Sequence, residues 1–375
     1  MDIRLATSAD AEACNAFFNR AYGLNRTSDQ WRWGFVPRDF PSDVLPYVVI
    51  TDKGKVIGTQ AFIPIRMIDE RGVFWTVKSE ETLVDADYRG QKLFEKMYDL
   101  LFDFLKQHRI HCIWGFTPAT RAFQRLGFAI PRVTSQLFVP FTGAAVTASL
   151  KQHTDLARQG FAGRMTALAW SVGGSLASTL ASLRYRAGRA AAKRRGGGLD
   201  LRVLDEAPPA AGDLSERFIR LFGGTTIHRD ATYLQWRFFE NPYVKATVVG
   251  AFAQGQLVGW IAYALGDDGM GYIVDLMVAP LGDASEQAPM IVSRLLRESV
   301  DALRCAGALG VRGWHVTEHP VDAMILKEAR ALGFYHVKRG HTVVLYTNQQ
   351  SDRAEAIASF DRWFVTRIFT EGALG

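Results

Sequence analysis

The chain contains two similar halves, and this internal repeat constrains its fold more than any other feature of the sequence. A Gln-Trp-Arg tripeptide occurs at residues 30–32 and again at residues 235–237. A Leu-Gly-Phe tripeptide follows each of them, at residues 126–128 and 332–334. The separation from the glutamine to the glycine is 97 residues in the first half (30 to 127) and 98 in the second (235 to 333). Two landmarks at nearly equal separation indicate two copies of one domain.

The hydrophobic pattern predicts the same order of strands and helices in both halves. Short alternating apolar runs indicate strands, and apolar residues at helical spacing indicate helices between them. In the first half we expect strands over residues 3–7, 47–50, 56–65, 73–84, 112–116 and 128–138, and helices over 10–22, 30–33, 91–108 and 118–127. The second half repeats this order from residue 201. The sequence therefore predicts an α/β fold of the α+β type, with one mixed sheet in each half.

Changes in composition along the chain place the expected domain boundaries. The expected parts are a first domain over residues 1–139, a helical and basic linker over 140–200, a second domain over 201–350, and a C-terminal tail over 351–375 that packs on the second domain. Residues 165–183 carry no charge, and six arginines and lysines follow between residues 184 and 195. Three interpretations of 165–195 stay open: a helix packed on the domains, an interfacial helix on anionic lipid, or a membrane span.

The overall composition is that of an ordinary globular protein. Hydrophobic residues make up 48% of the chain and charged residues 22%, with a net charge of +6. This modest positive charge suits an anionic partner such as a nucleotide cofactor or an acidic membrane surface, and we expect no nucleic-acid partner. The three cysteines are far apart, and no secretory signal precedes the first strand. A reducing, cytoplasmic location is expected, with peripheral contact at the inner membrane face as a further possibility.

A strand, a turn and a helix over residues 82–94 have the features of a phosphate site. An apolar strand end is followed by a polar turn with Arg89 and Gly90, and then by a long amphipathic helix. The first amide groups of a helix have no internal partner and the helix dipole is positive there, so the turn favours an anion. Gly90 permits close approach of the backbone, and Arg89 adds a positive charge. The segment predicts binding of a phosphate-bearing cofactor.

At residues 89–94, Arg-Gly-Gln-Lys-Leu-Phe, the chain resembles the GNAT superfamily of acyl-CoA N-acyltransferases. The signature of that family is Arg or Gln, two residues, Gly, one residue, and Gly or Ala. Arg89 and Gly90 match, whereas Lys92 and Phe94 stand at the fourth and sixth positions, where the family has small residues. Lys92 can either crowd the phosphates or bind them. The predicted order of elements is also that of the family, and the resemblance covers residues 1–139 and about 200–350.

The resemblance implies how this segment would hold acetyl-CoA as co-substrate. Backbone amides of the turn would bind the pyrophosphate. The pantetheine arm would pair with the strand end in a gap between two diverging strands, one ending near Val84 and the other beginning near Cys112. The residues implied in cofactor binding are Thr82, Leu83, Val84, Arg89, Gly90, Gln91, Lys92, Leu93 and Phe94.

The resemblance also implies a general base and an acid for the thiolate, and it requires no metal. The base would be Glu81 or Glu80, since the family often carries a glutamate on this strand. Neighbouring strand residues point to opposite faces, so only one of the two is expected to face the cleft, and a bulge common at this strand favours Glu81. The alternative is that both are solvated strand-end charges. Phe123 stands where the family often has a tyrosine acid, which leaves Tyr88 or Tyr98, or no acid at all.

The second half lacks the cofactor signature. Its strand over residues 272–278 is followed by Ala-Pro-Leu-Gly-Asp-Ala-Ser-Glu over 279–286, without Arg-Gly and with two acids. We therefore expect no coenzyme A there, and a role in completing the acceptor pocket or in assembly. His315, Glu318 and His319 are expected to be structural or acceptor-side residues and not metal ligands, since Pro320 breaks the helical spacing.

The resulting hypothesis is an N-acyltransferase, most simply an N-acetyltransferase, that moves an acetyl group from acetyl-CoA to a small-molecule amine. Residues 228–242 are loosely similar to a motif of tandem GNAT-like proteins of surface polysaccharide synthesis, which makes an amino sugar one candidate acceptor. Two alternatives remain. One is a Fem-type transferase that uses aminoacyl-tRNA, and the other is a scaffold or sensor without catalytic activity.

Overall fold

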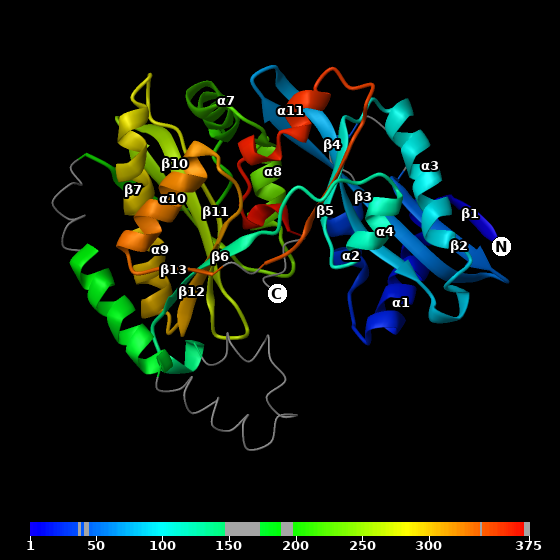
Figure 1. The fold of residues 1–375 in the computed structure, drawn as a ribbon, viewed down its shortest axis with the longest axis horizontal. Coiled ribbons are helices and arrows are strands. Elements are labelled where there is room, and N and C mark those ends of the chain that lie inside the picture. The colour runs from blue at the N-terminus through cyan, green and yellow to red at the C-terminus, as the bar shows by residue number, and fades with distance from the viewer. Residues whose placement is uncertain (37–38, 41–44, 147–172, 189–197, 338–339, 371–375) are drawn as a thin grey trace. The chain divides into compact units, whose positions relative to one another are not determined.

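The computed structural model describes residues 1–375 except 37–38, 41–44, 147–172, 189–197, 338–339 and 371–375. The chain forms two compact units, and each contains a seven-stranded sheet (Figure 1). Unit 1 comprises Met1–Val133, Thr225–His228 and His341–Phe360. Unit 2 comprises Thr134–Gly224, Arg229–Gly340 and Asp361–Gly375. Both sheets are mixed, as the sequence predicts.

The sheet of unit 1 has the order β1-β2-β3-β4-β5-β14, and β8 pairs with β3. Its strands are β1 (Asp2–Leu5), β2 (Tyr47–Asp52), β3 (Lys55–Asp69), β4 (Gly72–Val84), β5 (Cys112–Phe116), β8 (Thr226–Ile227) and β14 (Val343–Thr347). Its helices are α1 (Ala11–Tyr22), α2 (Ser28–Phe35), α3 (Leu93–Gln107), α4 (Thr120–Arg125) and α11 (Ala354–Ala358). The pair β4–β5 is parallel, and the other ladders of this sheet are antiparallel.

Helices cover both faces of this sheet. Successive side chains of β2 point alternately to the two faces and so show which residues pack on each of them. Val48 and Ile50 belong to one apolar cluster, in which α3 contributes Met97 and its neighbours. Tyr47 and Val49 belong to a second cluster, to which α1 contributes Phe17 and α2 contributes Trp31. Helix α3 therefore packs on one face, and α1 and α2 pack on the other (Figure 1).

The sheet of unit 2 has the order β13-β6-β12-β11-β10-β9-β7. Its strands are β6 (Ser135–Pro140), β7 (Asp200–Leu204), β9 (Thr247–Ala253), β10 (Gln256–Leu265), β11 (Gly271–Val278), β12 (Gly310–His315) and β13 (Tyr335–Val337). Its helices are α7 (Ala211–Phe222), α8 (Ala231–Leu234), α9 (Ala288–Cys305) and α10 (Pro320–Ala331), and residues 173–188 are also helical. The second Gln-Trp-Arg tripeptide lies in a π-helical turn, Gln235–Phe239, directly after α8.

The last strand of each half pairs in the sheet of the other unit. Strand β6 of the first half lies beside β12, and β14 of the second half lies beside β5. The predicted boundaries after residues 139 and 350 assign β6 to the first domain and β14 to the second. The sheet pairing places β6 in unit 2 and β14 in unit 1. The predicted tail is divided in the same way, because residues 351–360 belong to unit 1 and later residues to unit 2. A strand pattern in the sequence does not identify the pairing partner, so this exchange could not be predicted.

Much of the predicted linker over residues 140–200 lies outside the described residues. Its described part includes the helix over residues 173–188. None of the helices in the described ranges combines the length and the hydropathy of a membrane span.

Candidate active site

The turn between β4 and α3 presents backbone amides at the start of a long helix. A 3₁₀ turn, Ala86–Tyr88, follows the strand, and the first residue of α3 is Leu93, two residues later than predicted. Within the described chain, the amides of Leu93, Phe94 and Glu95 donate no hydrogen bond, and no side chain caps the helix. A Cβ added at Gly90 would meet no atom within 4 Å, so this part of the turn is open. The turn can therefore accept an anion on its amides.

Lys92 keeps the backbone conformation that a glycine adopts easily. Its φ is +57° and it is the N-cap residue of α3. Left-handed backbone costs a residue with a side chain about 1–2 kcal/mol. The family signature has glycine at this position, and glycine adopts left-handed backbone without this cost. The Lys92 side chain is exposed and adds a positive charge beside the open amides.

Strands β4 and β5 diverge beside this turn and leave one edge of β4 unpaired. Their ladder contains Val77 with Ile113 and Lys78 with Trp114, and it ends there. A Cβ on Gly115 would lie 3.1 Å from the carbonyl oxygen of Ser79, so the strands are still close where they separate. Strand β4 continues for six further residues to Val84. The gap lies where the resemblance implies the pantetheine arm, with Thr82, Leu83 and Val84 along its edge.

A β-bulge in β4 shapes the acidic part of the site. Thr59 pairs with Leu83 and Ala61 with Glu80, so two residues of β4 lie opposite Gln60. Glu81 is one of them, and its φ is +50°. Bulges twist a strand and redirect its side chains. The strict alternation expected for this strand therefore does not hold at Glu80 and Glu81.

Glu81 is held by two partners on the face covered by α1 and α2. Arg26 donates from Nη1 to Oε2 at 2.5 Å and from Nη2 to Oε1 at 3.3 Å. The Tyr47 hydroxyl donates to the same carboxylate in a short hydrogen bond. The Glu81 side chain is 3% exposed and that of Arg26 is 8% exposed. Burial raises the pKa of Glu81, and the hydrogen bond and charge of Arg26 oppose this shift.

Arg26 is itself fixed in place, so the orientation of Glu81 is well defined. Its Nε donates to Asn15 Oδ1 at 2.7 Å, and its guanidinium carbon lies 3.8 Å from the centre of the Phe18 ring. Both partners are on α1. A carboxylate that is buried, oriented and paired with an arginine in this way can serve as a proton acceptor when it is ionised.

Glu80 lies on the same face, in a different environment. It pairs across the ladder with Ala61, which belongs to the cluster of α1 and α2. Its carboxylate accepts a short hydrogen bond from Lys78, and its side chain is 13% exposed. Neither glutamate is therefore a solvated strand-end charge.

The two candidate tyrosines lie on different parts of unit 1. The Tyr88 hydroxyl donates to Asp52 Oδ2 at 2.9 Å, and this bond is the main cause of its raised pKa. The Tyr98 hydroxyl shares a hydrogen bond of 2.6 Å with Ser79 Oγ. Ser79 is the first residue beyond the paired part of β4, so Tyr98 lies at the gap. Burial raises the pKa of Tyr98 well above its usual range.

Phe123 and Phe94 pack beside Tyr98 in the apolar core of unit 1. Phe123 packs against Phe94, Tyr98 and Phe128 with ring centres 5.4, 5.7 and 5.0 Å apart. These rings belong to the cluster under α3. Phe94, which replaces a small residue of the signature, thus contributes to the core of unit 1.

Unit 2 repeats the buried pair of arginine and acid, which the sequence analysis overlooked. Arg26 directly precedes Thr27, the N-cap of α2, and Arg229 directly precedes Asp230, the N-cap of α8. Arg229 Nε lies 3.0 Å from Asp275 Oδ2, and both side chains are fully buried. Asp275 and Glu81 each stand three residues before the end of their strands, β11 and β4. Comparison of the two halves at these positions would have revealed Arg26.

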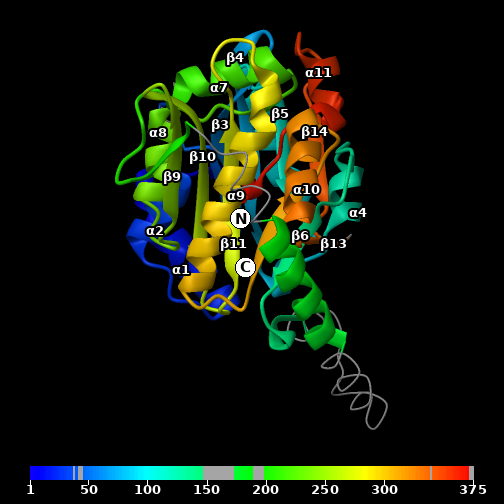
Figure 2. The ribbon, with the colours of Figure 1, turned by 90° about the vertical axis from the view of Figure 1, so that its left-hand side faces the viewer.

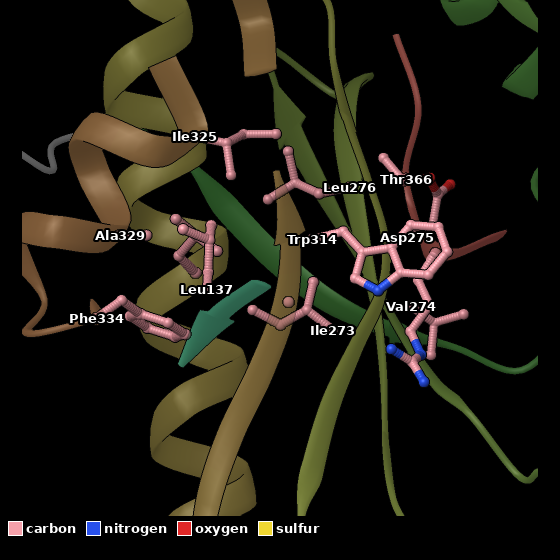
Figure 3. Close-up of a pocket in the computed structure, with 13 residues that line it drawn as sticks. Leu137, Ile273, Val274, Asp275, Leu276, Trp314, Ile325, Ala329, Phe334 and Thr366 are labelled. Atoms are coloured by element: carbon pink, nitrogen blue, oxygen red, sulfur yellow. The ribbon is translucent and has the colours of Figure 1, made fainter. Parts of the chain in front are cut away.

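The gap of unit 2 is occupied by the chain's own C-terminal segment. Strands β11 and β12 pair at Gly271–Val311 and Tyr272–Arg312 and then diverge. The Thr366 hydroxyl donates to Asp275 at 2.6 Å, and the Arg367 guanidinium carbon lies 4.7 Å from the centre of the Tyr272 ring. A small pocket remains, with Thr366 beside Asp275 and a largely apolar wall (Figure 3). Its lining comprises Leu137, Ile273, Val274, Asp275, Leu276, Leu296, Gly313, Trp314, Ile325, Ala329, Phe334, Thr366 and Arg367.

The histidines singled out in the sequence have structural partners in unit 2. His319 is the N-cap of α10, and its Nε2 lies 3.0 Å from the carbonyl oxygen of Gly223. His315 Nδ1 lies 3.1 Å from Asp322 Oδ1. Across the described residues, no group of three or more His, Cys, Asp or Glu is arranged to hold a metal ion.

Comparison with known proteins supports the assignment made from the sequence. Residues 2–130 match the family model described as an acetyltransferase (GNAT) domain. A search of curated proteins finds no significant match.

Three solved structures share the fold over most of the chain. A probable N-acyltransferase from Enterococcus faecalis has 7% identity and a TM-score of 0.57, with 92% of this chain and 72% of that chain covered. A GCN5-related N-acetyltransferase from Anabaena variabilis has 11% identity and a TM-score of 0.58, with the same coverage of 92% and 72%. Saccharomyces cerevisiae N-myristoyltransferase has 11% identity and a TM-score of 0.54, with 92% and 79% covered. These likenesses concern the fold.

The turn at Gly90, the diverging strands β4 and β5, and the family match all lie in the first 130 residues. The two mixed sheets agree with two GNAT-like domains in one chain. Residues 2–130 are therefore a GNAT acetyltransferase domain.

Proposed function

We propose that unit 1 is an N-acyltransferase that moves an acyl group, most simply acetyl, from coenzyme A to a small-molecule amine. One observation carries this proposal: the open amides at the start of α3 and the unpaired edge of β4 lie in one continuous segment, residues 79–95. The amides suit phosphates, and the strand edge suits the amide groups of a pantetheine arm.

Two segments of unit 1 would bind different parts of this donor. The amides from Gly90 to Glu95, with the charges of Arg89 and Lys92, would hold the pyrophosphate. The strand end from Thr82 to Val84 would supply backbone donors and acceptors to the arm. When bound, coenzyme A supplies a thioester, whose carbonyl carbon accepts the nucleophile.

Glu81 is the proposed proton acceptor, with Glu80 as the second candidate. Arg26 favours the ionised form of Glu81 although the site is buried. The amine must lose a proton to attack, and Glu81 would take it directly or through a water molecule. The new C–N bond then forms, the C–S bond breaks, and the thiolate leaves.

The thiolate requires little assistance, since a free thiol has a pKa of about 8.5. Tyr98 is the better placed of the two tyrosines to protonate it, because its hydroxyl bonds Ser79 at the gap. Tyr88, the other candidate from the sequence, donates its hydroxyl hydrogen bond to Asp52. We propose Tyr98 as the donor if one is needed.

The acceptor is proposed to be an amine, with amino sugars as the first class to test, and the location to be cytoplasmic. The similarity of residues 228–242 to proteins of polysaccharide synthesis supports this order of testing. An assay that measures release of free coenzyme A from acetyl-CoA with amino sugars, amino acids and polyamines tests the proposal. The proposal predicts acceptor-dependent release by the full chain, and strong loss of release in Glu81→Gln.

The matched control for Glu81→Gln is Glu80→Gln, which removes the same charge from the neighbouring position. Release of coenzyme A that survives Glu81→Gln but not Glu80→Gln would make Glu80, and not Glu81, the proton acceptor. No release with any amine would contradict the enzymatic proposal. Affinity for tRNA that falls steeply with salt would then favour the Fem-type alternative.

A further inference from the structure

The helix over residues 173–188 is fixed to unit 2 through one face. Gly174, Ser178, Ala181 and Tyr185, which recur at helical spacing, are buried. The Tyr185 hydroxyl donates to Asp301 of α9 in a short hydrogen bond. The Tyr335 hydroxyl donates to the carbonyl oxygen of Ala177 at 2.9 Å. These contacts define which side of the helix faces the domain. Figure 2 shows the course of this helix as the green ribbon that carries no label.

The opposite face carries a stripe of exposed leucines. Leu176, Leu180 and Leu183 are 63%, 53% and 57% exposed. Their spacing of four and three residues places them on one line along the helix. Single exposed leucines need no explanation, but three on one stripe of a helix form an apolar surface. We call Leu176, Leu180 and Leu183 the leucine stripe.

Positive charge follows the leucine stripe in the sequence. Arg184 and Arg186 follow it on the same helix, and both are exposed. Arg189, Lys193, Arg194 and Arg195 come next in the sequence, and no Asp or Glu occurs between residues 156 and 199. A partner for this surface must therefore offer an apolar layer together with negative charge.

We propose that the leucine stripe, together with Arg184 and Arg186, docks unit 2 on an anionic lipid bilayer. The leucines would enter the boundary between headgroups and acyl chains, and the arginines would contact anionic headgroups. A second copy of the chain fits less well, since two such surfaces would bring like charges together. This docking is independent of acyl transfer and goes beyond the proposed function of unit 1.

Vesicle flotation of the full chain tests the proposal. The probes are vesicles of phosphatidylcholine alone and of phosphatidylcholine mixed with phosphatidylglycerol. The variant Leu176→Ser/Leu180→Ser/Leu183→Ser removes the stripe, and Leu24→Ser/Val203→Ser/Leu265→Ser is the matched control with exposed apolar residues elsewhere. The altered residues are exposed in both variants, so both should melt close to the wild-type temperature.

The expected result is binding to the anionic vesicles, weak binding to the neutral ones, and a loss of at least about tenfold in the stripe variant. Arg184→Gln/Arg186→Gln should weaken binding by about tenfold and reduce its salt dependence. The control variant should bind like the wild type. No binding of the wild type to anionic vesicles would overturn the proposal, as would equal binding of the stripe variant. A concentration-dependent dimer that is lost in the stripe variant, without vesicle binding, would assign the surface to a second copy instead.

Discussion

The Arg26 guanidinium donates two hydrogen bonds to the Glu81 carboxylate, and the shorter of them is 2.5 Å. The same relationship recurs between Arg229 and Asp275 in unit 2. In both units the arginine directly precedes a helix N-cap and the acid lies near the end of a central strand. The pair is a feature of the repeated fold, and the two copies differ in what lies beside the acid. In unit 1 the gap is unpaired along β4, whereas in unit 2 the C-terminal segment contacts the acid.

Replacing Arg26 should damage both stability and acyl transfer. Arg26→Gln removes the charge that favours ionised Glu81, while burial continues to raise the pKa of that carboxyl. Loss of one partner from a buried ion pair costs about 3–5 kcal/mol. Chemical denaturation monitored by circular dichroism measures this cost. A variant as stable as the wild type would show that the pair contributes nothing to the folded state.

The pH dependence of acyl transfer should reflect the ionisation of the Glu81 carboxyl. The rate needs the ionised carboxylate, so activity should rise with pH through an apparent pKa above the usual glutamate value. Arg26→Gln should move this rise to higher pH, because the opposing positive charge is gone. A pH–rate profile of kcat/KM with a saturating amine measures the position of this rise in the wild type and its shift in Arg26→Gln. An unchanged rise in Arg26→Gln would mean that another group is titrating.

Substitutions at Lys92 should separate the effect of its backbone conformation on acetyl-CoA affinity from the effect of its charge. Lys92→Gly relieves left-handed strain but makes the unfolded chain more flexible, so the net change in stability should stay within about 1 kcal/mol. Lys92→Ala loses the same charge and keeps the strain. Both should weaken acetyl-CoA binding by about three- to fivefold, the effect of one charge near a helix start. Weakening in one variant alone would show that conformation at residue 92, and not charge, controls affinity.

Introducing the missing tyrosine should not improve the enzyme. Phe123→Tyr would place a hydroxyl among the rings of Phe94, Tyr98 and Phe128. A buried hydroxyl without a partner costs about 1–3 kcal/mol. Thermal melting and the coenzyme A release assay check the two effects. Higher activity without loss of stability would show that the hydroxyl reaches the gap.

The contact between the tail and Asp275 should stabilise unit 2 without affecting donor binding. Thr366→Val removes the hydroxyl that donates to Asp275 and should cost about 1–3 kcal/mol. The stoichiometry of acetyl-CoA binding should remain one per chain. A second binding site in Thr366→Val would show that the tail alone keeps the gap of unit 2 closed.

Local patterns predicted much of the fold. The repeat, the order of elements and the turn at Gly90 depend on residues that are close in sequence, and the structure has them. The exchange of β6 and β14 depends on pairing between distant segments, which periodicity does not encode. The resemblance implies a bulge in this strand, but the common orientation of Glu80 and Glu81 depends on its place, which requires knowledge of the register with β3. The filling of the second gap depends on the tail, whose sequence shows no distinctive pattern.

The site was predicted less completely than the fold, because several of its contacts join residues that are far apart in the sequence. The turn residues from Arg89 to Phe94 form one continuous segment. The partners of Glu81 are Arg26, in the connection between α1 and α2, and Tyr47 on β2, and both are more than thirty residues away in sequence. Tyr88 and Tyr98 were both candidates from the sequence, and only the structure shows that the Tyr88 hydroxyl bonds Asp52. Contacts of this kind follow from packing and not from spacing.

Calorimetric titration of the full chain with acetyl-CoA tests the central claim most directly. Gly90→Asp places a negative charge in the turn, and Gly90→Asn is the matched neutral control, since both residues tolerate left-handed backbone. We predict one site per chain in the wild type, weaker binding in Gly90→Asn, and no measurable binding in Gly90→Asp. Absence of binding at millimolar acetyl-CoA, or equal affinity of the two variants, would contradict the assignment of the donor site to this turn.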